Sequence, residues 1–467
     1  MSNSITLNEL TYQLSKEIQD KEGRTRSRTA DEEIRFDYAL TKMLEDIWSN
    51  YVAHPDSECS IHKRRGAYSE NTKYRDPNLT YRMAMAAFDG LLNLDMIRIT
   101  RNGFYDRTSF QGDLTKYRPT QRLVERIEEI ESHPAIYIKP NLDDQTIIMR
   151  NVIEGRKIAE TYDETSFTDK ARKNLRTINA CITRHWTDLM IKDDEYKKLQ
   201  ERLLIDDDKQ PIDLTKKMLY RIFSNNDFGQ GGRFYRGWWQ NVPSEYRQFI
   251  TIDSKKTQEY DFSQLNPNMI YSLHNLELGS EDAYSRVLDG EHRKIVKQAF
   301  NAMIQASTPL RGQPEKINLD TIEMTWAELR QAVLDSHKPI QHLFFSGLGN
   351  QLQFEDSNMA EGIMLHFSAM DAPALPIHDS FVMHHGYASE LQESMQRTFY
   401  DRFKRQIIAN REKELVKVVH NDVPLDSPDF WDDTSVEAIL EGDKEYSQWQ
   451  DRDAMWLSRN KKNNMNV

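Results

Sequence analysis

One short segment constrains the fold most, because it places charged residues between two apolar runs. In the segment 375–383, apolar residues flank a polar centre formed by His378, Asp379 and Ser380. This pattern predicts a hairpin with the polar centre in its turn. A histidine and a carboxylate are costly to bury unless they are paired or bind a metal ion. The segment therefore predicts a hairpin with a functional group at its tip.

Asp261 occupies a comparable position at the end of a predicted strand. A β-prone run at 248–253 begins a hairpin whose second strand ends at Asp261, and a helical segment at 269–274 follows. Such a sheet would fix the carboxylate at the edge of a cleft, which suits a divalent cation. An aspartate before a helix also serves as an N-cap, so Asp261 by itself leaves both interpretations open.

Asp261 and Asp379 together predict a two-metal centre. Two carboxylates from separate strands can share two Mg²⁺ ions about 3.5–4 Å apart, which stabilise the attacking and leaving oxygens of a phosphoryl transfer. Mg²⁺ prefers a few carboxylates together with phosphate oxygens and water. We therefore expect both residues to be catalytic metal ligands, with Mg²⁺ as the cofactor and Mn²⁺ as a substitute.

A predicted helix at 291–304 carries a regular set of polar residues. Arg293, Lys297 and Asn301 follow one another at intervals of four residues, so they line one face. Two cations one turn apart can bind a triphosphate, and the third position can meet the sugar or the base. The same pattern is also typical of a solvated basic face.

A glycine-rich segment precedes these motifs. Gly231 and Gly232 lead into Arg233, and the sequence Gln240-Asn241-Val242-Pro243 follows. Glycines let the backbone and an arginine approach a phosphate closely. Without the other motifs, this segment is a glycine-rich turn with no assigned role.

Five motifs occur in the order found in family A DNA polymerases: Gly-Gly-Arg at 231–233, Gln-Asn-Val-Pro at 240–243, Asp-Phe-Ser-Gln at 261–264, Arg-x-x-x-Lys at 293–297 and His-Asp-Ser at 378–380. Over about residues 215–405 the chain resembles the palm and fingers of that family, and more distantly the single-subunit phage and mitochondrial RNA polymerases. The resemblance implies that Asp261 and Asp379 bind the metal ions, and that Arg293 and Lys297 bind the incoming triphosphate. It also implies an α+β right-hand polymerase, with an antiparallel palm sheet and helical fingers and thumb.

Further roles follow from the same resemblance. It places His378 near the primer end and lets Arg233, Gln240 and Asn241 contact the primer–template duplex. The expected partners are nucleic acid, as a primer–template or single-stranded DNA, and nucleoside triphosphates. No second acidic constellation occurs in the N-terminal half, so we expect no proofreading exonuclease.

Sugar selection is less clear, because the chain departs from the family pattern. The DNA polymerases carry Glu where this chain has Asn266, and a bulky aromatic residue where it has Asn301. Ser380 after Asp379 is more like the RNA polymerases. The other motifs favour DNA synthesis. The alternatives are RNA synthesis, template-independent terminal transfer, and a catalytically silent nucleic-acid-binding protein.

Composition changes along the chain predict five segments. They are a polar N-terminal arm or loosely docked helix at 1–30, a winged-helix-like nucleic-acid-binding domain at 31–135, a helical thumb-like region at 136–225, the palm and fingers at 226–420 and an acidic tail at 421–467. The second segment is expected to contain helices at 30–51 and 79–94, then a hairpin around Asn102 and Gly103.

Charge and cysteine usage set the broad class. The chain has 467 residues and a net charge of −12, of which the tail contributes eleven acidic against five basic residues. A nucleic-acid binder needs local basic surface rather than a basic total. Cys59 and Cys181 are the only cysteines, and no apolar stretch approaches a membrane span or a signal peptide. These features favour a cytoplasmic protein without a membrane partner.

Overall fold

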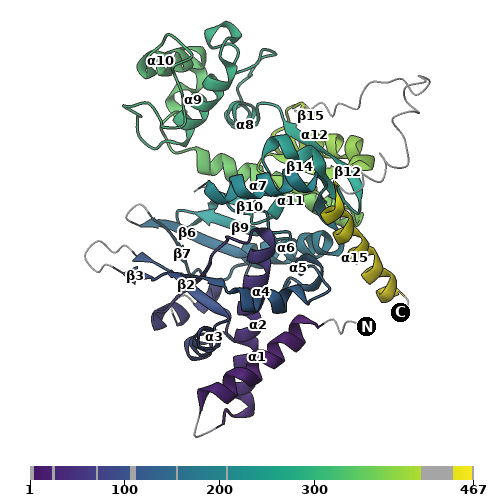
Figure 1. The fold of residues 1–467 in the computed structure, drawn as a ribbon. Helices are drawn as coiled ribbons and strands as arrows, with labels where there is room; N and C mark the ends of the chain where they lie inside the picture. The colour runs from purple at the N-terminus through teal and green to yellow at the C-terminus, as the bar shows by residue number, and fades with distance from the viewer. Residues whose placement is uncertain are drawn as a thin grey trace, which may run out of the picture.

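The structure combines helices with several sheets around two hydrophobic cores (Figure 1). This computed structural model describes residues 5–23, 27–69, 72–105, 112–153, 156–206, 209–411 and 445–464. One core is built from residues between 7 and 130, and the other from residues between 135 and 409. The expected α+β class is confirmed.

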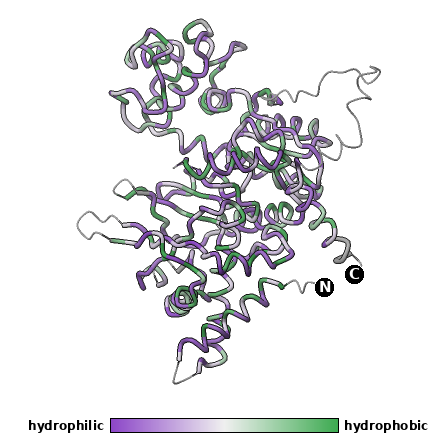
Figure 2. Tube along the Cα trace, in the orientation of Figure 1, coloured by the Kyte–Doolittle hydropathy of each residue, from purple (hydrophilic) through white to green (hydrophobic). Residues whose placement is uncertain are grey.

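The N-terminal domain begins earlier than the sequence analysis placed it. Helix α1 (Leu7–Glu22) starts with a capping box formed by Thr6 and Glu9, and its side chains Leu7, Leu14 and Ile18 are buried in the first core. The stretch 1–30, expected to form a polar arm or a loosely docked helix, thus contributes a core helix. Its composition is polar, and Figure 2 shows hydrophilic and hydrophobic residues interspersed along it. The residues Leu7, Leu10, Leu14 and Ile18 recur at helical spacing and are all buried, so they lie on one side of the helix.

The rest of this domain follows the expected order of two helices and then strands, but the hairpin predicted around Asn102 and Gly103 is wrong. The strand before this turn, Ile97–Arg101, pairs with Thr115–Pro119, and the strand after it, Phe104–Tyr105, pairs with Gly112–Asp113. Helices α2 (Ala30–Ala53) and α3 (Tyr81–Asn93) pack together, and a three-stranded antiparallel sheet has the order β1-β5-β2. Its strands and the neighbouring elements are β1 (Cys59–Ile61), β2 (Ile97–Arg101), β5 (Thr115–Pro119), the small hairpin β3 (Phe104–Tyr105) and β4 (Gly112–Asp113), and helices α4 (Gln121–Glu128) and α5 (Pro134–Tyr137).

A four-stranded sheet occupies the region that was expected to be mostly helical. Its order is β10-β9-β6-β7, with β6 and β9 parallel and the other pairs antiparallel. Its strands are β6 (Ile147–Ile153), β7 (Arg156–Glu160), β9 (Tyr220–Ser224) and β10 (Asp227–Tyr235). The helices α6 (Ser166–Arg184) and α7 (Asp193–Ile205) dominate the composition between these strands. The short strands were missed for that reason, and the sheet crosses the expected boundary at 225.

The main antiparallel sheet carries the predicted hairpin. Its order is β13-β14-β12-β11-β8, and β15 also pairs with β12. The strands are β8 (Thr187–Leu189), β11 (Ile250–Ile252), β12 (Lys255–Phe262), β13 (Leu375–Ile377), β14 (Ser380–His384) and β15 (Ala409–Arg411). Helix α12 (Ala388–Phe403) packs on this sheet, and the long helix α11 (Gly349–Ala369) lies between α12, α6 and β10.

Three helices form a separate lobe at the top of Figure 1. They are α8 (Leu265–Leu273), α9 (Arg293–Gln305) and α10 (Trp326–Ser336). Helix α8 follows β12 directly, and α9 and α10 pack against each other. The lobe is thus attached to the main sheet at the end of β12 that carries Asp261.

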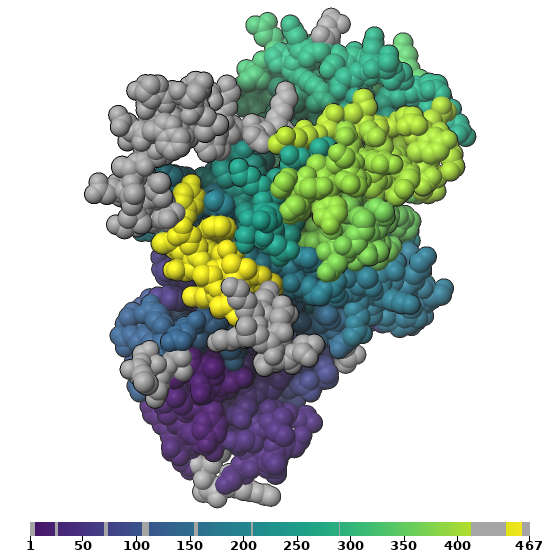
Figure 3. Space-filling model, turned by 90° about the vertical axis from the view of Figure 1, so that its right-hand side faces the viewer, coloured from purple at the N-terminus to yellow at the C-terminus, as the bar shows by residue number. Residues whose placement is uncertain are grey.

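Part of the expected acidic tail is a docked helix. Figure 3 shows α15 (Ser447–Asn464, yellow) lying along the surface of the body. Arg452 makes two hydrogen bonds of 2.9 and 3.0 Å to Asp188 of β8, and both side chains are at most 7% exposed. Trp456 stacks on Trp186 with ring centroids 5.5 Å apart. Residues 421–444 of the expected tail lie outside the described part of the chain.

Candidate active site

The strand register brings Asp261 and Asp379 to the same end of two neighbouring strands. Asp261 of β12 lies opposite Ser380 of β14, and Asp379 is the residue just before Ser380. Opposed residues in an antiparallel pair are about 4.5–5.5 Å apart at Cβ. Both aspartates are half-buried. The two carboxylates that the sequence singled out, 118 positions apart, are therefore neighbours.

A tight hairpin positions Asp379. Strands β13 and β14 pair antiparallel, with His378 and Asp379 forming the two-residue turn between them. His378 has a φ of 58°, the left-handed conformation that such a turn requires. The predicted hairpin with its polar tip is confirmed, and the turn directs Asp379 to the same sheet end as Asp261.

The 3-10 helix that contains Gln240 holds this hairpin through hydrogen bonds to β13. The Gln240 side-chain amide donates hydrogen bonds of 3.0 Å to the carbonyl oxygens of Phe234 and Pro376, and the indole N–H of Trp239 also donates to Pro376. Gln240, expected to contact nucleic acid, thus holds the strand that leads to Asp379. Asn241, half-buried, ends the same 3-10 helix, Trp238–Asn241.

A third carboxylate lies on the same face of the sheet. Glu259 precedes Asp261 by two residues, so the two side chains leave β12 on one side. The Ser380 hydroxyl donates to Glu259 at 2.5 Å, and Arg247 pairs with the same oxygen at 3.0 Å. These contacts fix the start of β14 beside Asp379. The sequence analysis missed Glu259, although its spacing from Asp261 on a strand was a usable signal.

The Arg233 side chain forms an ion pair with a buried carboxylate. Its Nε donates to Asp356 of α11 at 2.7 Å, and the Asp356 side chain is 2% exposed. Burial raises the pKa of Asp356 to about 6; the Arg233 charge opposes this shift and the nearby Asp379 adds to it. Partial desolvation, then the Arg233 charge, lowers the pKa of His378, whose side chain is nevertheless solvent-accessible. The four groups form one electrostatic cluster.

The loop before α9 closes the other side of the cluster. Burial and then the charge of Asp379 raise the pKa of Tyr284, and Asp261 contributes in the same direction. Tyr284 therefore lies within electrostatic reach of both aspartates. Gln264, which has a φ of 53°, accepts a hydrogen bond of 2.5 Å from the Ala283 N–H. The glutamine of the Asp261 motif thus fixes the loop that carries Tyr284.

Among the predicted nucleotide-binding residues of helix α9, Arg293 is linked to this region through Tyr284. Arg293, the first residue of this helix, pairs with Asp282 at 2.7 and 3.1 Å, and its guanidinium lies 5.3 Å from the Tyr284 ring. Lys297, one turn further, is exposed. Asp282 and Tyr284 carried no motif of their own, so the sequence analysis did not identify them.

The two asparagines that depart from the family pattern contact each other. The Asn266 amide of α8 donates a hydrogen bond of 2.9 Å to the Asn301 side chain of α9. Both positions were expected near the sugar or base of a nucleotide. The structure brings the two side chains into contact, and both are neutral amides.

The donor set at the sheet end fits hard divalent cations. Asp261 and Asp379 offer carboxylate oxygens from a rigid sheet, which is the ligand type that Mg²⁺ prefers. Arg293 lies 5.3 Å from the Tyr284 ring, and Tyr284 is within electrostatic reach of both aspartates, so a cation lies near the carboxylate pair.

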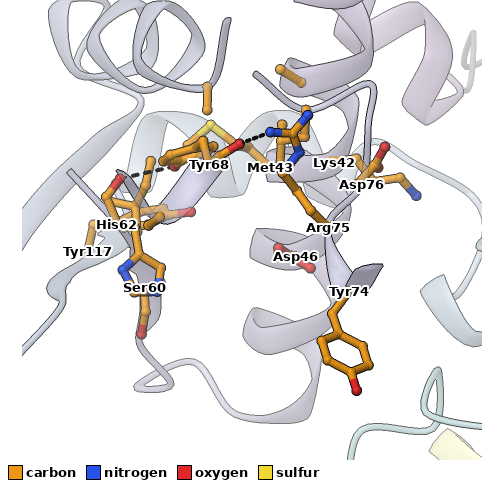
Figure 4. A pocket seen from close by; sticks show the side chains of 15 residues that line it. Lys42, Met43, Asp46, Ser60, His62, Tyr68, Tyr74, Arg75, Asp76 and Tyr117 are labelled. Carbon is orange, nitrogen blue, oxygen red and sulfur yellow. Dashed lines mark hydrogen bonds between the residues drawn. The ribbon is translucent and has the colours of Figure 1, made fainter. Parts of the chain in front are cut away.

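A separate cavity of about 410 Å³ lies in the N-terminal domain, between α2, α3 and β5 (Figure 4). Its wall includes Asp46, Tyr68, Tyr74, Arg75 and Tyr117. Burial raises the pKa of Asp46, although solvent reaches the side chain, as expected for a carboxylate facing a cavity. None of the lining residues belongs to the main sheet, so this cavity is distinct from the aspartate pair.

Two comparisons with known proteins found no match. No protein family model matches the chain, and no curated protein matches it significantly. Among the residues that the structure describes, no helix combines the length and apolar character needed to cross a membrane. Any functional conclusion therefore depends on the geometry of the site itself.

Proposed function

We propose that the chain is a nucleic-acid polymerase that adds nucleoside monophosphates to a 3′-hydroxyl. The observation that carries this proposal is the register of β12 and β14, which sets Asp261 beside Asp379 at one end of the sheet. A protein that only binds nucleic acid has no need for two adjacent carboxylates there. The class would be a right-hand polymerase similar to family A, with DNA synthesis favoured.

The parts of the molecule take the following roles in this proposal. The β13-β14-β12-β11-β8 sheet is the palm, and the lobe of α8, α9 and α10 is the fingers. The region around α6 and α7 is the thumb-like part. The N-terminal domain, with its winged-helix-like order of elements, binds nucleic acid.

Asp261 and Asp379 would hold two Mg²⁺ ions. The ions, when bound, activate the 3′-hydroxyl and stabilise the charge on the departing pyrophosphate. Arg293 and Lys297 contribute to the same stabilisation by contacting the triphosphate. Arg293 first exchanges Asp282 for phosphate, which costs little because an ion pair with this much exposure, 45% for the Arg293 side chain, is weak.

The residues around the turn would position the primer. His378 is exposed beside Asp379, where its ring can contact the primer end. Arg233 donates a hydrogen bond from Nε to Asp356, which leaves its terminal nitrogens to contact a phosphate. Gln240 acts indirectly, by holding the backbone of β13.

Sugar selection is the part for which an alternative has specific support. The Asn266–Asn301 pair offers no carboxylate or aromatic ring to exclude a ribose 2′-hydroxyl. RNA synthesis is therefore the second candidate. Parallel reactions with dNTPs and NTPs distinguish the two.

The test is Mg²⁺-dependent extension of a labelled primer, annealed or single-stranded. Asp379→Asn should reduce extension by at least about 10³-fold, since metal-bound transition-state stabilisation is worth several kcal/mol. Glu393→Gln, which changes an exposed carboxylate of α12, should leave extension unchanged. Wild-type extension by Asp379→Asn would reject the proposed centre. Metal-independent binding without any extension would support the silent nucleic-acid-binding protein instead.

A further inference from the structure

A cluster of three different side chains lies at the opposite end of the main sheet from the aspartate pair. Cys181 of α6, His185 just after that helix and Asp371 in the loop before β13 each offer one ligand atom, and these atoms all lie within 4.8 Å of one another. Cys181 is 1% exposed, whereas Asp371 is exposed. The cluster takes no part in the proposed polymerase reaction.

We propose that Cys181, His185 and Asp371 bind one Zn²⁺ ion. A thiolate and an imidazole favour Zn²⁺ over the hard cations Mg²⁺ and Ca²⁺, and a carboxylate is a common third ligand. The fourth position would be taken by water. The site is independent of the proposed Mg²⁺ centre, and its test does not require that the chain be a polymerase.

The spacing of the ligand atoms supports a shared ion. His185 Nε2 lies 3.5 Å from Asp371 Oδ1, which is too long for a good hydrogen bond. Two bonds of about 2.0–2.1 Å at a tetrahedral angle would set the two ligand atoms about 3.4 Å apart. Nε2 is buried and makes no hydrogen bond within the described part of the chain, although the Cys181 sulfur is near enough to interact with it.

The outer contacts of such a site are already in place. His185 Nδ1 contacts the Asp253 carboxylate at 2.5 Å, and the other Asp253 oxygen accepts from the Trp186 N–H at 2.9 Å. Arg184 donates to Asp371 Oδ1 at 2.5 Å. Metal-binding histidines usually direct their second nitrogen to a carboxylate, and metal-binding carboxylates are themselves hydrogen-bonded. An ordinary ion-pair network, with a protonated His185 between Asp253 and Asp371, would account for the direction of both ring nitrogens but would not need the buried Cys181 thiol.

The ion would join three segments that support the palm. His185 directly follows α6, Asp253 lies in the turn between β11 and β12, and Asp371 precedes β13. Strand β12 runs from this turn to Asp261, eight residues further on, which corresponds to about 26 Å. The proposed Zn²⁺ therefore fixes the far ends of the strands that carry the aspartate pair.

The test is metal binding by the full chain after treatment with a chelator. One Co²⁺ per chain should bind and give the near-ultraviolet charge-transfer band of a thiolate ligand, and Zn²⁺ should displace it. Asp261→Asn and Cys59→Ser should keep the band, because they alter the proposed Mg²⁺ site and the other buried cysteine. Cys181→Ser should abolish it.

Variants at exposed positions test metal binding without the risk that a substitution in the core prevents folding. Asp371→Asn should weaken Zn²⁺ binding while the circular dichroism spectrum remains that of the wild type. Asp253→Asn should weaken it by about 10- to 100-fold, as for other outer-shell partners. Absence of the band in the folded wild type, or its persistence in Cys181→Ser, would show that the cluster is only an ion-pair network.

Discussion

Replacing Asp356 by Asn should both destabilise the protein and weaken Mg²⁺ binding at the proposed Asp261–Asp379 centre. Asp356 is the buried partner of Arg233, and the contact between them is 2.7 Å. Removing one partner of a buried ion pair typically costs about 3–5 kcal/mol, because the other charge remains buried without compensation. Arg233 keeps 21% of its side chain exposed, so we expect about 3 kcal/mol, at the lower end of that range.

The same change should affect Asp379. Asp356 and Arg233 both lie within electrostatic reach of that carboxylate. Without the negative charge of Asp356, the Arg233 guanidinium would compete with Mg²⁺ for Asp379. We expect the Mg²⁺ concentration for half-maximal extension to rise.

The assay is thermal and urea-induced unfolding, followed by circular dichroism, with Mg²⁺ titrations of primer extension. The matched control is Glu355→Gln, on the neighbouring position of α11. Glu355 pairs with Arg402, whose side chain is 51% exposed, so its loss should cost only about 1 kcal/mol. The double variant Asp356→Asn/Arg233→Met should recover much of the lost stability, since both charges are then gone. Equal losses for Asp356→Asn and Glu355→Gln would refute the reasoning.

Three other predictions concern separate parts of the molecule. Burial lowers the pKa of His337 to about 4, so between pH 6.5 and 4 the unfolded chain binds a proton that the folded chain does not. The free energy of unfolding should therefore fall by about 3 kcal/mol as the pH drops through this window. In urea titrations at several pH values, His337→Gln should reduce this pH dependence. Arg452→Met should cost about 3–5 kcal/mol by leaving Asp188 buried and unpaired, and should expose α15 to limited proteolysis; unchanged protease resistance would contradict this. Asn266→Glu should lower kcat/KM for NTPs relative to dNTPs by at least about tenfold, and an unchanged ratio would show that Asn266 does not face the sugar.

Much of the local structure could be predicted from the sequence. The β13–β14 hairpin was expected because apolar runs flank a short polar centre, and α3 and α9 were expected from their periodicity. The β6–β7 hairpin was missed, because short strands between long amphipathic helices give a weak signal. Residues 1–30 were expected to form a polar arm or a loosely docked helix, and the burial of α1 in the core was missed because its core-facing residues are few in a polar segment.

The candidate site was predictable only in part, because some of its residues are recognised by their neighbours in the fold and not by a motif. Asp261, Asp379 and the residues of α9 belong to motifs that can be found along the chain. Asp356, Glu259 and Tyr284 do not, because their role depends on what lies beside them after folding. Asp356 meets Arg233 across 123 positions of sequence.

The sequence by itself determined the residue types available for chemistry and the elements that carry them. These follow from short-range physics: the period of apolar residues, the caps and the turn residues. Only the tertiary structure decided that Asp261 pairs opposite Ser380, that Gln240 supports Pro376, and that Cys181 and His185 meet Asp371. Such contacts depend on strand register and on packing between distant segments. A shift of one residue in that register would turn Asp261 to the other face of the sheet.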